Sequence, residues 1–160
     1  MQPRIEAPTS VELARSPRER VHLLVARIGE EAVAGWCAAL LNGTDSYADP
    51  RRPAITWLGG RHAAGLLRRG RFEERGQDYW PRVWAARGLL YAWHPGAEGA
   101  VLAGLRDRSA WRVREMSAKV ARQRGIVTAE PVLSRLLDDP YARVRAAAEA
   151  ALTESARSRG

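Results

Sequence analysis

The sequence has very little cysteine and no long apolar run. Cys37 is the single cysteine, so the chain can form neither an intramolecular disulfide nor a cysteine-rich zinc site. Its position in the apolar stretch AVAGWCAALL predicts a buried, inert thiol. No run of about 18 uncharged apolar residues occurs, and the first residues lack the apolar core of a signal peptide. We therefore expect a soluble, cytoplasmic protein with no membrane partner.

Lysine is also nearly absent, although the chain is strongly basic. All of its 26 basic residues except Lys119 are arginines, and the formal net charge is +8. This charge favours an anionic partner, either nucleic acid or an acidic protein surface. The abundance of Arg and Ala is equally compatible with a genome biased toward G and C, so the charge alone does not establish an anionic partner.

Motifs that carry enzymatic chemistry are missing as well. The sequence contains no nucleophile elbow and no cluster of metal ligands. Its two GxxG-like fragments, LGGRHAAG and HPGAEGAVLAG, lack the Lys-Ser/Thr pair of a phosphate-binding loop. His22, His62 and His94 occupy different places in the repeating pattern described below. We therefore predict no enzymatic activity, no cofactor and no metal site.

An internal repeat of about 31 residues organises the chain. The dipeptide Arg-Val occurs at residues 82–83, 112–113 and 143–144, at intervals of 30 and 31 residues. The segments AEGAVLAGLRD and AEPVLSRLLDD begin 32 residues apart, in the same order relative to this dipeptide. An acidic residue precedes each copy of the dipeptide, namely Asp78, Asp107 and Asp139. Matched segments in the same order indicate a structural repeat.

Each repeat unit is predicted to contain two helices joined by a short turn. Apolar residues at helical spacing occur in both halves, and the Asp of the turn can accept hydrogen bonds from the N–H groups that open the second helix. The second helices are expected at residues 17–28, 51–59, 79–93, 110–124 and 141–155. The first helices are expected at residues 30–41, 61–70, 97–106 and 129–138. The sequence does not determine the structure of residues 44–60, because Pro53 and Gly59-Gly60 interrupt the repeat pattern there.

The pattern resembles the HEAT repeat family in its short bacterial form. The resemblance depends on Asp107 followed by Val113-Arg114, Ser117 and Val120, and on Asp139-Pro140 followed by Val144-Arg145, Ala148 and Leu152. It covers residues 79–152 well and residues 17–70 loosely. It implies an all-α fold, a right-handed α-solenoid of about four to five stacked antiparallel helix pairs, whose concave face is lined by the second helices. The domain would span residues 16–153, between an N-terminal extension (1–15) and a disordered tail (154–160).

The resemblance also assigns a structural role to one column of arginines. In the family, the residue after the core Val pairs with the Asp of the turn and forms a ladder between neighbouring units. Arg114 and Arg145 would take this role with Asp107 and Asp139. The preceding unit has Trp84 at the corresponding place, so the ladder is expected to end or change there.

A second column of arginines is the candidate binding surface. Arg82, Arg112 and Arg143 each precede the core Val, and the same face of helix 110–124 continues through polar side chains. This face is either exposed to solvent without a binding role, or it is a basic site that binds phosphates or an acidic peptide. Trp84 and Trp93 are expected in the core, whereas Trp80 and Trp111 lie in first turns beside arginines. The candidate partner-binding residues are Trp80, Arg82, Trp111, Arg112, Glu115, Lys119, Arg122 and Arg143.

Two functional hypotheses follow, with one enzymatic variant. The first is a non-catalytic scaffold that binds a partner protein with an acidic surface through this face, and the second is a nucleic-acid-binding protein that uses the same face. The face is also similar to that of HEAT-like alkylpurine DNA glycosylases. This resemblance implies that Glu115, one helical turn from Trp111, would be the catalytic carboxylate. Trp80 or Trp84 would be the second aromatic residue of the site. The chain departs from that family in its short length and in having Glu where Asp is usual.

Overall fold

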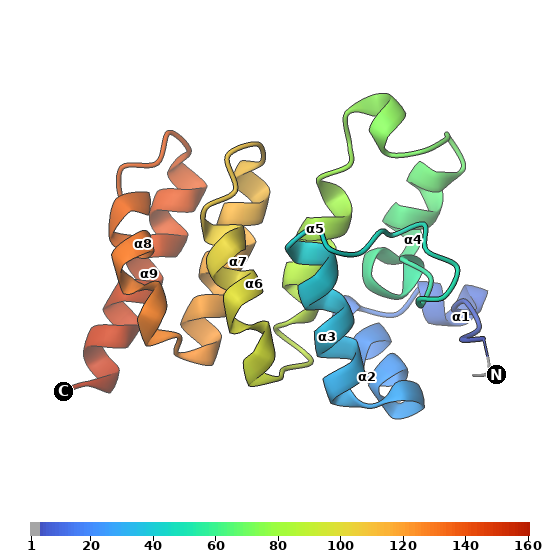
Figure 1. Cartoon of the computed structure of the whole chain (residues 1–160), viewed down its shortest axis with the longest axis horizontal. Coiled ribbons are helices and arrows are strands. Elements are labelled where there is room, and N and C mark those ends of the chain that lie inside the picture. The colour runs from blue at the N-terminus through green and yellow to red at the C-terminus, as the bar shows by residue number, and fades with distance from the viewer. Residues whose placement is uncertain (1–3) are drawn as a thin grey trace.

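The computed structural model describes residues 4–160, and within this range the chain forms helices joined by turns, without strands (Figure 1). The N-terminal half contains α1 (Ser10–Leu13), α2 (Pro17–Ile28), α3 (Glu30–Leu41) and α4 (Thr56–Leu67). The C-terminal half contains α5 (Trp80–Gly88), α6 (Glu98–Leu105), α7 (Trp111–Arg124), α8 (Glu130–Leu136) and α9 (Ala142–Ser158). Single 3-10 turns, η1 (Glu73–Arg75), η2 (Pro95–Ala97) and η3 (Val127–Ala129), precede α5, α6 and α8.

The helices from α5 onward, together with α3, form two layers along the long axis of the molecule. Helices α5, α7 and α9 pack against one another in one layer, and α3, α6 and α8 follow one another in the other (Figure 1). Contacts between the layers join α3 with α5, α6 with α7, and α8 with α9. This arrangement of stacked helix pairs confirms the predicted all-α solenoid.

Small and β-branched residues form the buried stripes of the second helices α7 and α9. In α7 the buried stripe contains Val113, Ser117 and Val120, at the spacing of one helical face. In α9 the equivalent stripe contains Val144, Ala148 and Ala151. Both stripes therefore lie where the repeat pattern predicts the core.

Asp107 and Asp139 hold the starts of α7 and α9, as predicted, whereas Asp78 forms no such hydrogen bond before α5 within the described chain. The Oδ1 atom of Asp107 accepts hydrogen bonds from the backbone N–H groups of Ser109 and Ala110, each at 2.9 Å. The Oδ1 atom of Asp139 accepts one from the N–H of Tyr141 at 3.0 Å. Neither α7 nor α9 has a side-chain cap of its own, so these aspartates satisfy the backbone donors just before the helix.

Residues 42–70 differ from the predicted pair of helices at 51–59 and 61–70. The chain instead runs as an irregular segment to residue 55 and then forms the single helix α4, which is kinked at Gly60. Gly60 has φ 57°, a left-handed conformation that glycine tolerates best. As a result α3, which lies before this segment, takes the place beside α5 that the sequence assigns to residues 61–70.

Buried arginines support the kink in α4. The break at Gly60 leaves the carbonyl groups of Trp57 and Leu58 without helical partners. Arg20, which is only 4% exposed, donates from Nε to the Trp57 carbonyl at 3.2 Å and from Nη2 to the Leu58 carbonyl at 3.1 Å. Arg87 donates to the same Leu58 carbonyl at 2.9 Å. A side chain at Gly60 would meet the guanidinium carbon of Arg20 at 2.5 Å, so this close approach also requires glycine.

The C-terminal end of the chain is more ordered than the sequence predicts, and the described part of the N-terminal extension packs against the repeat domain. Helix α9 continues through residues 154–158 instead of giving way to a disordered tail, and Arg159 forms an ion pair with Glu130 at 2.9 Å. Within the N-terminal extension, α1 packs against α4, and the indole N–H of Trp57 donates to the carbonyl of Glu6 at 3.0 Å. Of the helices within residues 4–160, none has the length and apolar character needed to cross a bilayer.

Candidate interaction surface

A ladder of Arg–Asp pairs links the turns of neighbouring units. Arg114 donates from Nε and Nη2 to the carboxylate of Asp139, at 2.7 and 3.1 Å, and from Nη1 to the carbonyl of Asp107 at 2.8 Å. Arg145 donates to the Asp139 carbonyl at 2.7 Å. Burial by itself raises the pKa of Asp139, but hydrogen bonds from Arg114 and from the Tyr141 N–H outweigh this effect and leave the pKa below its ordinary value. The predicted structural role of Arg114 and Arg145 agrees with these contacts.

Arg82 belongs to this ladder and is not part of the candidate face, which corrects the prediction. Its guanidinium pairs with Asp107 and also donates to the Oγ atom of Ser109 at 3.2 Å. The pair Arg82–Asp107 has the same separation of 25 residues as the pair Arg114–Asp139. Arg82 is therefore equivalent to Arg114, and the ladder continues into the unit of α5 with Arg82 in place of a residue after the core Val.

This equivalence shifts the repeat register of the unit that contains α5 by two residues relative to the register predicted from the Arg-Val dipeptide. With Arg82 matched to Arg114, Trp80 takes the position of Arg112 in the next unit and of Arg143 in the last. The Arg-Val dipeptide at residues 82–83 therefore matches the later copies in sequence but not in position on the helix. The candidate face therefore presents a tryptophan, an arginine and an arginine at successive equivalent positions.

Aromatic rings and guanidinium groups interleave at the N-terminal ends of α5, α7 and α9. Arg112 places its guanidinium carbon 4.5 Å from the ring centre of Trp111, 5.4 Å from that of Trp80 and 5.8 Å from that of Tyr79. Trp111 also stacks on Tyr141, with ring centres 5.3 Å apart and planes inclined by 17°. We call the following set the Arg–aromatic cluster: Tyr79, Trp80, Trp111, Arg112, Tyr141 and Arg143, the last of which lies 5.7 Å from the Trp111 ring centre.

A shallow hollow of about 320 Å³ adjoins this cluster between α7 and α9. Its floor consists of Ala146, Ala147 and Ala150. Charged side chains surround that floor, namely Glu115, Lys119, Arg122 and Arg143. Because Arg143 belongs to both the hollow and the Arg–aromatic cluster, the two form one continuous surface.

Glu115 is neutralised within this surface. It is only 8% exposed, and its Oε1 atom lies 3.1 Å from both Arg143 Nε and Lys119 Nζ. Arg122 faces Glu154 at 3.6 Å. Glu115 therefore acts here as a shared anion between two cations, which is a structural arrangement rather than that of a free carboxylate.

The structure brings together seven of the eight predicted site residues and leaves out Arg82. It also adds Tyr79 and Tyr141, which sequence reasoning missed. Each of these tyrosines directly precedes a second helix, and this shared position is the signal that could have identified them. Tyr141 is 48% exposed and forms the outer edge of the cluster.

The remaining tryptophans have mainly structural roles. Trp84 is 1% exposed and lies in the core, as predicted. Trp93, which the sequence also assigns to the core, is only partly buried, and the guanidinium carbon of Arg124 lies 5.3 Å from its ring centre. Cys37 is fully buried, and burial raises the pKa of its thiol to about 12, so it is held as a neutral thiol.

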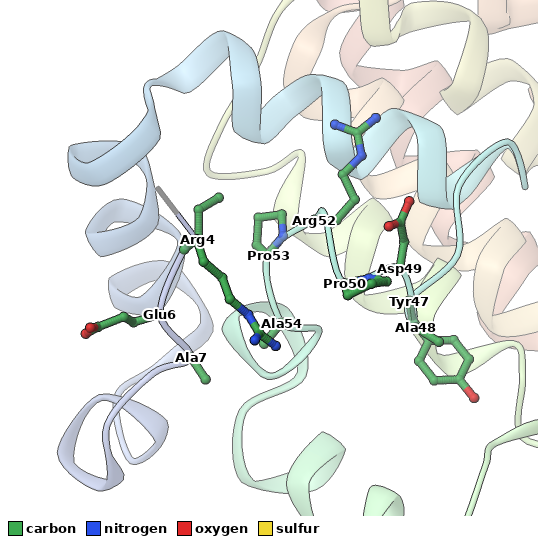
Figure 2. A pocket seen from close by; sticks show the side chains of 11 residues that line it. Arg4, Glu6, Ala7, Tyr47, Ala48, Asp49, Pro50, Arg52, Pro53 and Ala54 are labelled. Carbon is green, nitrogen blue, oxygen red and sulfur yellow. The ribbon is translucent and has the colours of Figure 1, made fainter. Parts of the chain in front are cut away.

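A larger hollow, of about 600 Å³, lies between the N-terminal segment 4–7 and the loop 47–54 (Figure 2). Two of the charged residues that line it pair with residues outside the lining: Asp49 with Arg51 at 2.9 Å, and Arg52 with Asp45 at 2.6 Å. Across residues 4–160, no group of three His, Cys, Asp or Glu side chains is placed to hold a metal ion. The surface on α5, α7 and α9 is therefore the stronger candidate for a binding site.

Comparison with known proteins identifies the class to which this fold belongs. The profile of the family described as HEAT repeats matches residues 73–153, which is half of the chain. The match begins just before α5 and ends within α9, so it covers the whole Arg–aromatic cluster. The chain belongs to the HEAT repeat family. No curated protein and no solved structure matches it at a significant level.

Proposed function

We propose that this chain is a non-catalytic scaffold that binds a partner protein through the surface formed by α5, α7 and α9. The observation that carries the proposal is the Arg–aromatic cluster beside an alanine-floored hollow. Trp, Tyr and Arg are the residue types that contribute most to the energy of protein interfaces. Family membership supports the proposal, because stacked helical repeats form extended surfaces on which other proteins are bound.

The charge of this surface favours an acidic partner. Its side chains include four cations, Arg112, Lys119, Arg122 and Arg143, but only two carboxylates, Glu115 and Glu154, lie against them. The surface thus carries an excess of two positive charges. Charge complementarity of this kind guides encounter and selects partners with acidic surfaces.

Site-specific photocrosslinking tests the proposal in cells. A photoreactive amino acid replaces Ala146, which is exposed in the hollow; the matched control carries it at Arg135, which is exposed on α8 in the other layer. We expect discrete protein adducts from position 146 that are absent from position 135. Identical adducts from both positions, or no adduct from position 146, would contradict the proposal.

Nucleic acid is the second candidate, and the net charge of +8 is the observation that favours it. Titration of labelled single-stranded and duplex DNA at two salt concentrations distinguishes the two candidates, because phosphate contacts weaken steeply as salt rises. Affinity that persists near physiological salt and falls in Arg112→Ala would favour nucleic acid. We expect neither form of DNA to bind near physiological salt.

A glycosylase activity at Glu115 has less physical support. The carboxylate is already held between Arg143 and Lys119, so it is poorly placed to stabilise a developing positive charge on a sugar. An assay for base release from alkylated DNA, with Glu115→Gln as the control, tests this alternative. Release that depends on Glu115 would overturn the non-catalytic assignment.

A further inference from the structure

Arg112 differs from the other cations of the surface because no acceptor satisfies it. Arg143 and Lys119 share Glu115, and Arg122 faces Glu154. Arg112, by contrast, makes contacts only with aromatic rings, and within residues 4–160 it has no hydrogen bond or ion pair to a carboxylate or carbonyl group. A half-buried guanidinium in this state depends on water for all of its N–H donors.

The rings around Arg112 hold its guanidinium in place. Trp80 comes from α5 and Trp111 from α7, so the group sits at the junction of two repeat units. Contacts with ring faces restrict the plane of a guanidinium without using its donors, which lie at its edge. Arg112 is therefore already ordered to form a fork of two parallel hydrogen bonds, which is the geometry that a carboxylate accepts.

We infer that Arg112 recognises the partner by binding one Asp or Glu carboxylate from an acidic peptide segment. This inference rests on the proposed function and names the chemistry of the partner at the same surface. The hollow next to Arg143 gives the segment a place to continue, because its alanine floor leaves room for a peptide backbone and its edge carries further cations. The ordered fork reduces the entropy that must be lost on binding.

The same geometry disfavours unpaired nucleic acid as the ligand. Stacking of bases needs free ring faces. Here the chain itself covers the rings: Trp80 stacks on Trp84 with ring centres 5.8 Å apart, and Trp111 lies between Tyr141 and Arg112 contacts. A base would have to displace these groups, whereas a carboxylate needs only the N–H donors of Arg112, which no protein acceptor within residues 4–160 occupies.

Calorimetric titration with a synthetic 12-residue peptide of alternating Glu and Ser tests the inference, with the same peptide carrying Gln in place of Glu as the chemical control. Tryptophan fluorescence gives a second readout, because two of the six tryptophans of the chain, Trp80 and Trp111, lie beside Arg112. Loss of a charged hydrogen-bonded pair predicts that Arg112→Gln weakens the Glu peptide about tenfold to a hundredfold. Arg112→Lys is expected to weaken it as well, since Lys keeps the charge but cannot form the fork.

Arg135→Gln is the matched control, because it removes the same charge from an exposed position on α8 and should bind like the unchanged protein. Thermal melts of every variant establish that each one is folded. Equal affinity in Arg112→Gln, full binding by Arg112→Lys, or equal binding of the Gln peptide would overturn the inference. Tighter binding of oligo-dT than of the Glu peptide, lost in Arg112→Gln, would also overturn it and would favour nucleic acid.

One further variant, with substitutions at two positions, separates failure of this inference from failure of the proposed function. If Arg112→Gln binds normally but the double variant Lys119→Gln/Arg122→Gln does not, the surface remains a binding site and only the role of Arg112 is rejected. If no variant affects binding, or the Glu peptide does not bind at all, the carboxylate inference is rejected. Crosslinking from position 146 then decides independently whether the surface contacts a protein.

Discussion

Arg112 and Arg114 lie only two residues apart on α7, yet their surroundings give them different roles. Arg114 points to the turn of the next unit, where Asp139 neutralises it and the pair is largely buried. Arg112 points to the aromatic rings and keeps its donors free. The direction of the side chain from the helix, rather than residue type, therefore separates the structural arginine from the candidate binding arginine.

Removal of the carboxylate at Asp139 is expected to destabilise the protein. Asp139→Asn leaves Arg114 without its anionic partner in a site where the two side chains are 12% and 4% exposed. We predict a loss of about 2–4 kcal/mol in the free energy of unfolding, because breaking one member of a buried pair leaves the other uncompensated. Urea denaturation measures this loss. Asp138→Asn, at the neighbouring exposed position, should change stability little, and equal effects at both positions would contradict the role of the ladder.

The same residue predicts a dependence of stability on pH. The pKa of Asp139 is lower in the folded state than in the unfolded chain, so the unfolded chain takes up the proton first as the pH falls. The stabilisation is complete well above the ordinary carboxyl pKa of about 4 and is lost as the pH falls through and below that value. Urea midpoints between pH 6 and pH 3 should therefore fall more steeply for the unchanged protein than for Asp139→Asn; parallel curves would contradict this account.

At the scale of elements, close helix packing depends on particular glycines. Gly104 of α6 lies very close to α7. A Cβ atom added at Gly104 would lie 3.1 Å from the Cβ atom of Ser117 and 3.2 Å from the Cδ1 atom of Leu41. Gly99 lies in the same helix, and an added Cβ there would meet nothing within 4 Å. Gly104 is therefore required for packing, whereas Gly99 shows only the general effect of glycine on the stability of a helix.

Substitution of these glycines by alanine should therefore have opposite effects. We predict that Gly104→Ala destabilises the protein by about 1–3 kcal/mol through overpacking between α6 and α7. Gly99→Ala should leave stability unchanged or raise it slightly, since alanine favours a helix by up to about 1 kcal/mol over glycine. Thermal denaturation followed by circular dichroism measures both changes. A loss in Gly99→Ala as large as in Gly104→Ala would contradict the proposed close packing.

Repeat spacing predicted the helices from residue 97 onward closely, because their core residues recur in matched segments. It did not predict which helix pairs with α5, because a period reports distance along the chain and not the choice of neighbour in space. The kink at Gly60 and the buried Arg20 that supports it involve contacts between distant residues that no local pattern records. The position of Arg82 was misassigned for a similar reason: the shared dipeptide matched in letters but not in side-chain direction.

At the scale of the whole molecule, the two layers have different surfaces. The layer of α5, α7 and α9 carries the Arg–aromatic cluster and the adjoining hollow. The layer of α3, α6 and α8 packs against it, with α3 on α5, α6 on α7 and α8 on α9. The candidate surface crosses from α5 to α9 and therefore exists only when three successive units are stacked. Binding and folding of the repeat array are thus expected to depend on each other.

NMR chemical-shift mapping tests the central claim most directly, since a chain of 17.7 kDa is small enough for its backbone amides to be followed individually. The acidic Glu–Ser peptide is titrated into labelled protein, and the shifts of the two layers are compared. The account predicts shifts concentrated at residues 79–84, 110–119 and 141–147, with Arg112 among the largest and the amides of α8 little changed. Shifts centred on α3, α6 and α8, or spread evenly over both layers, would contradict it.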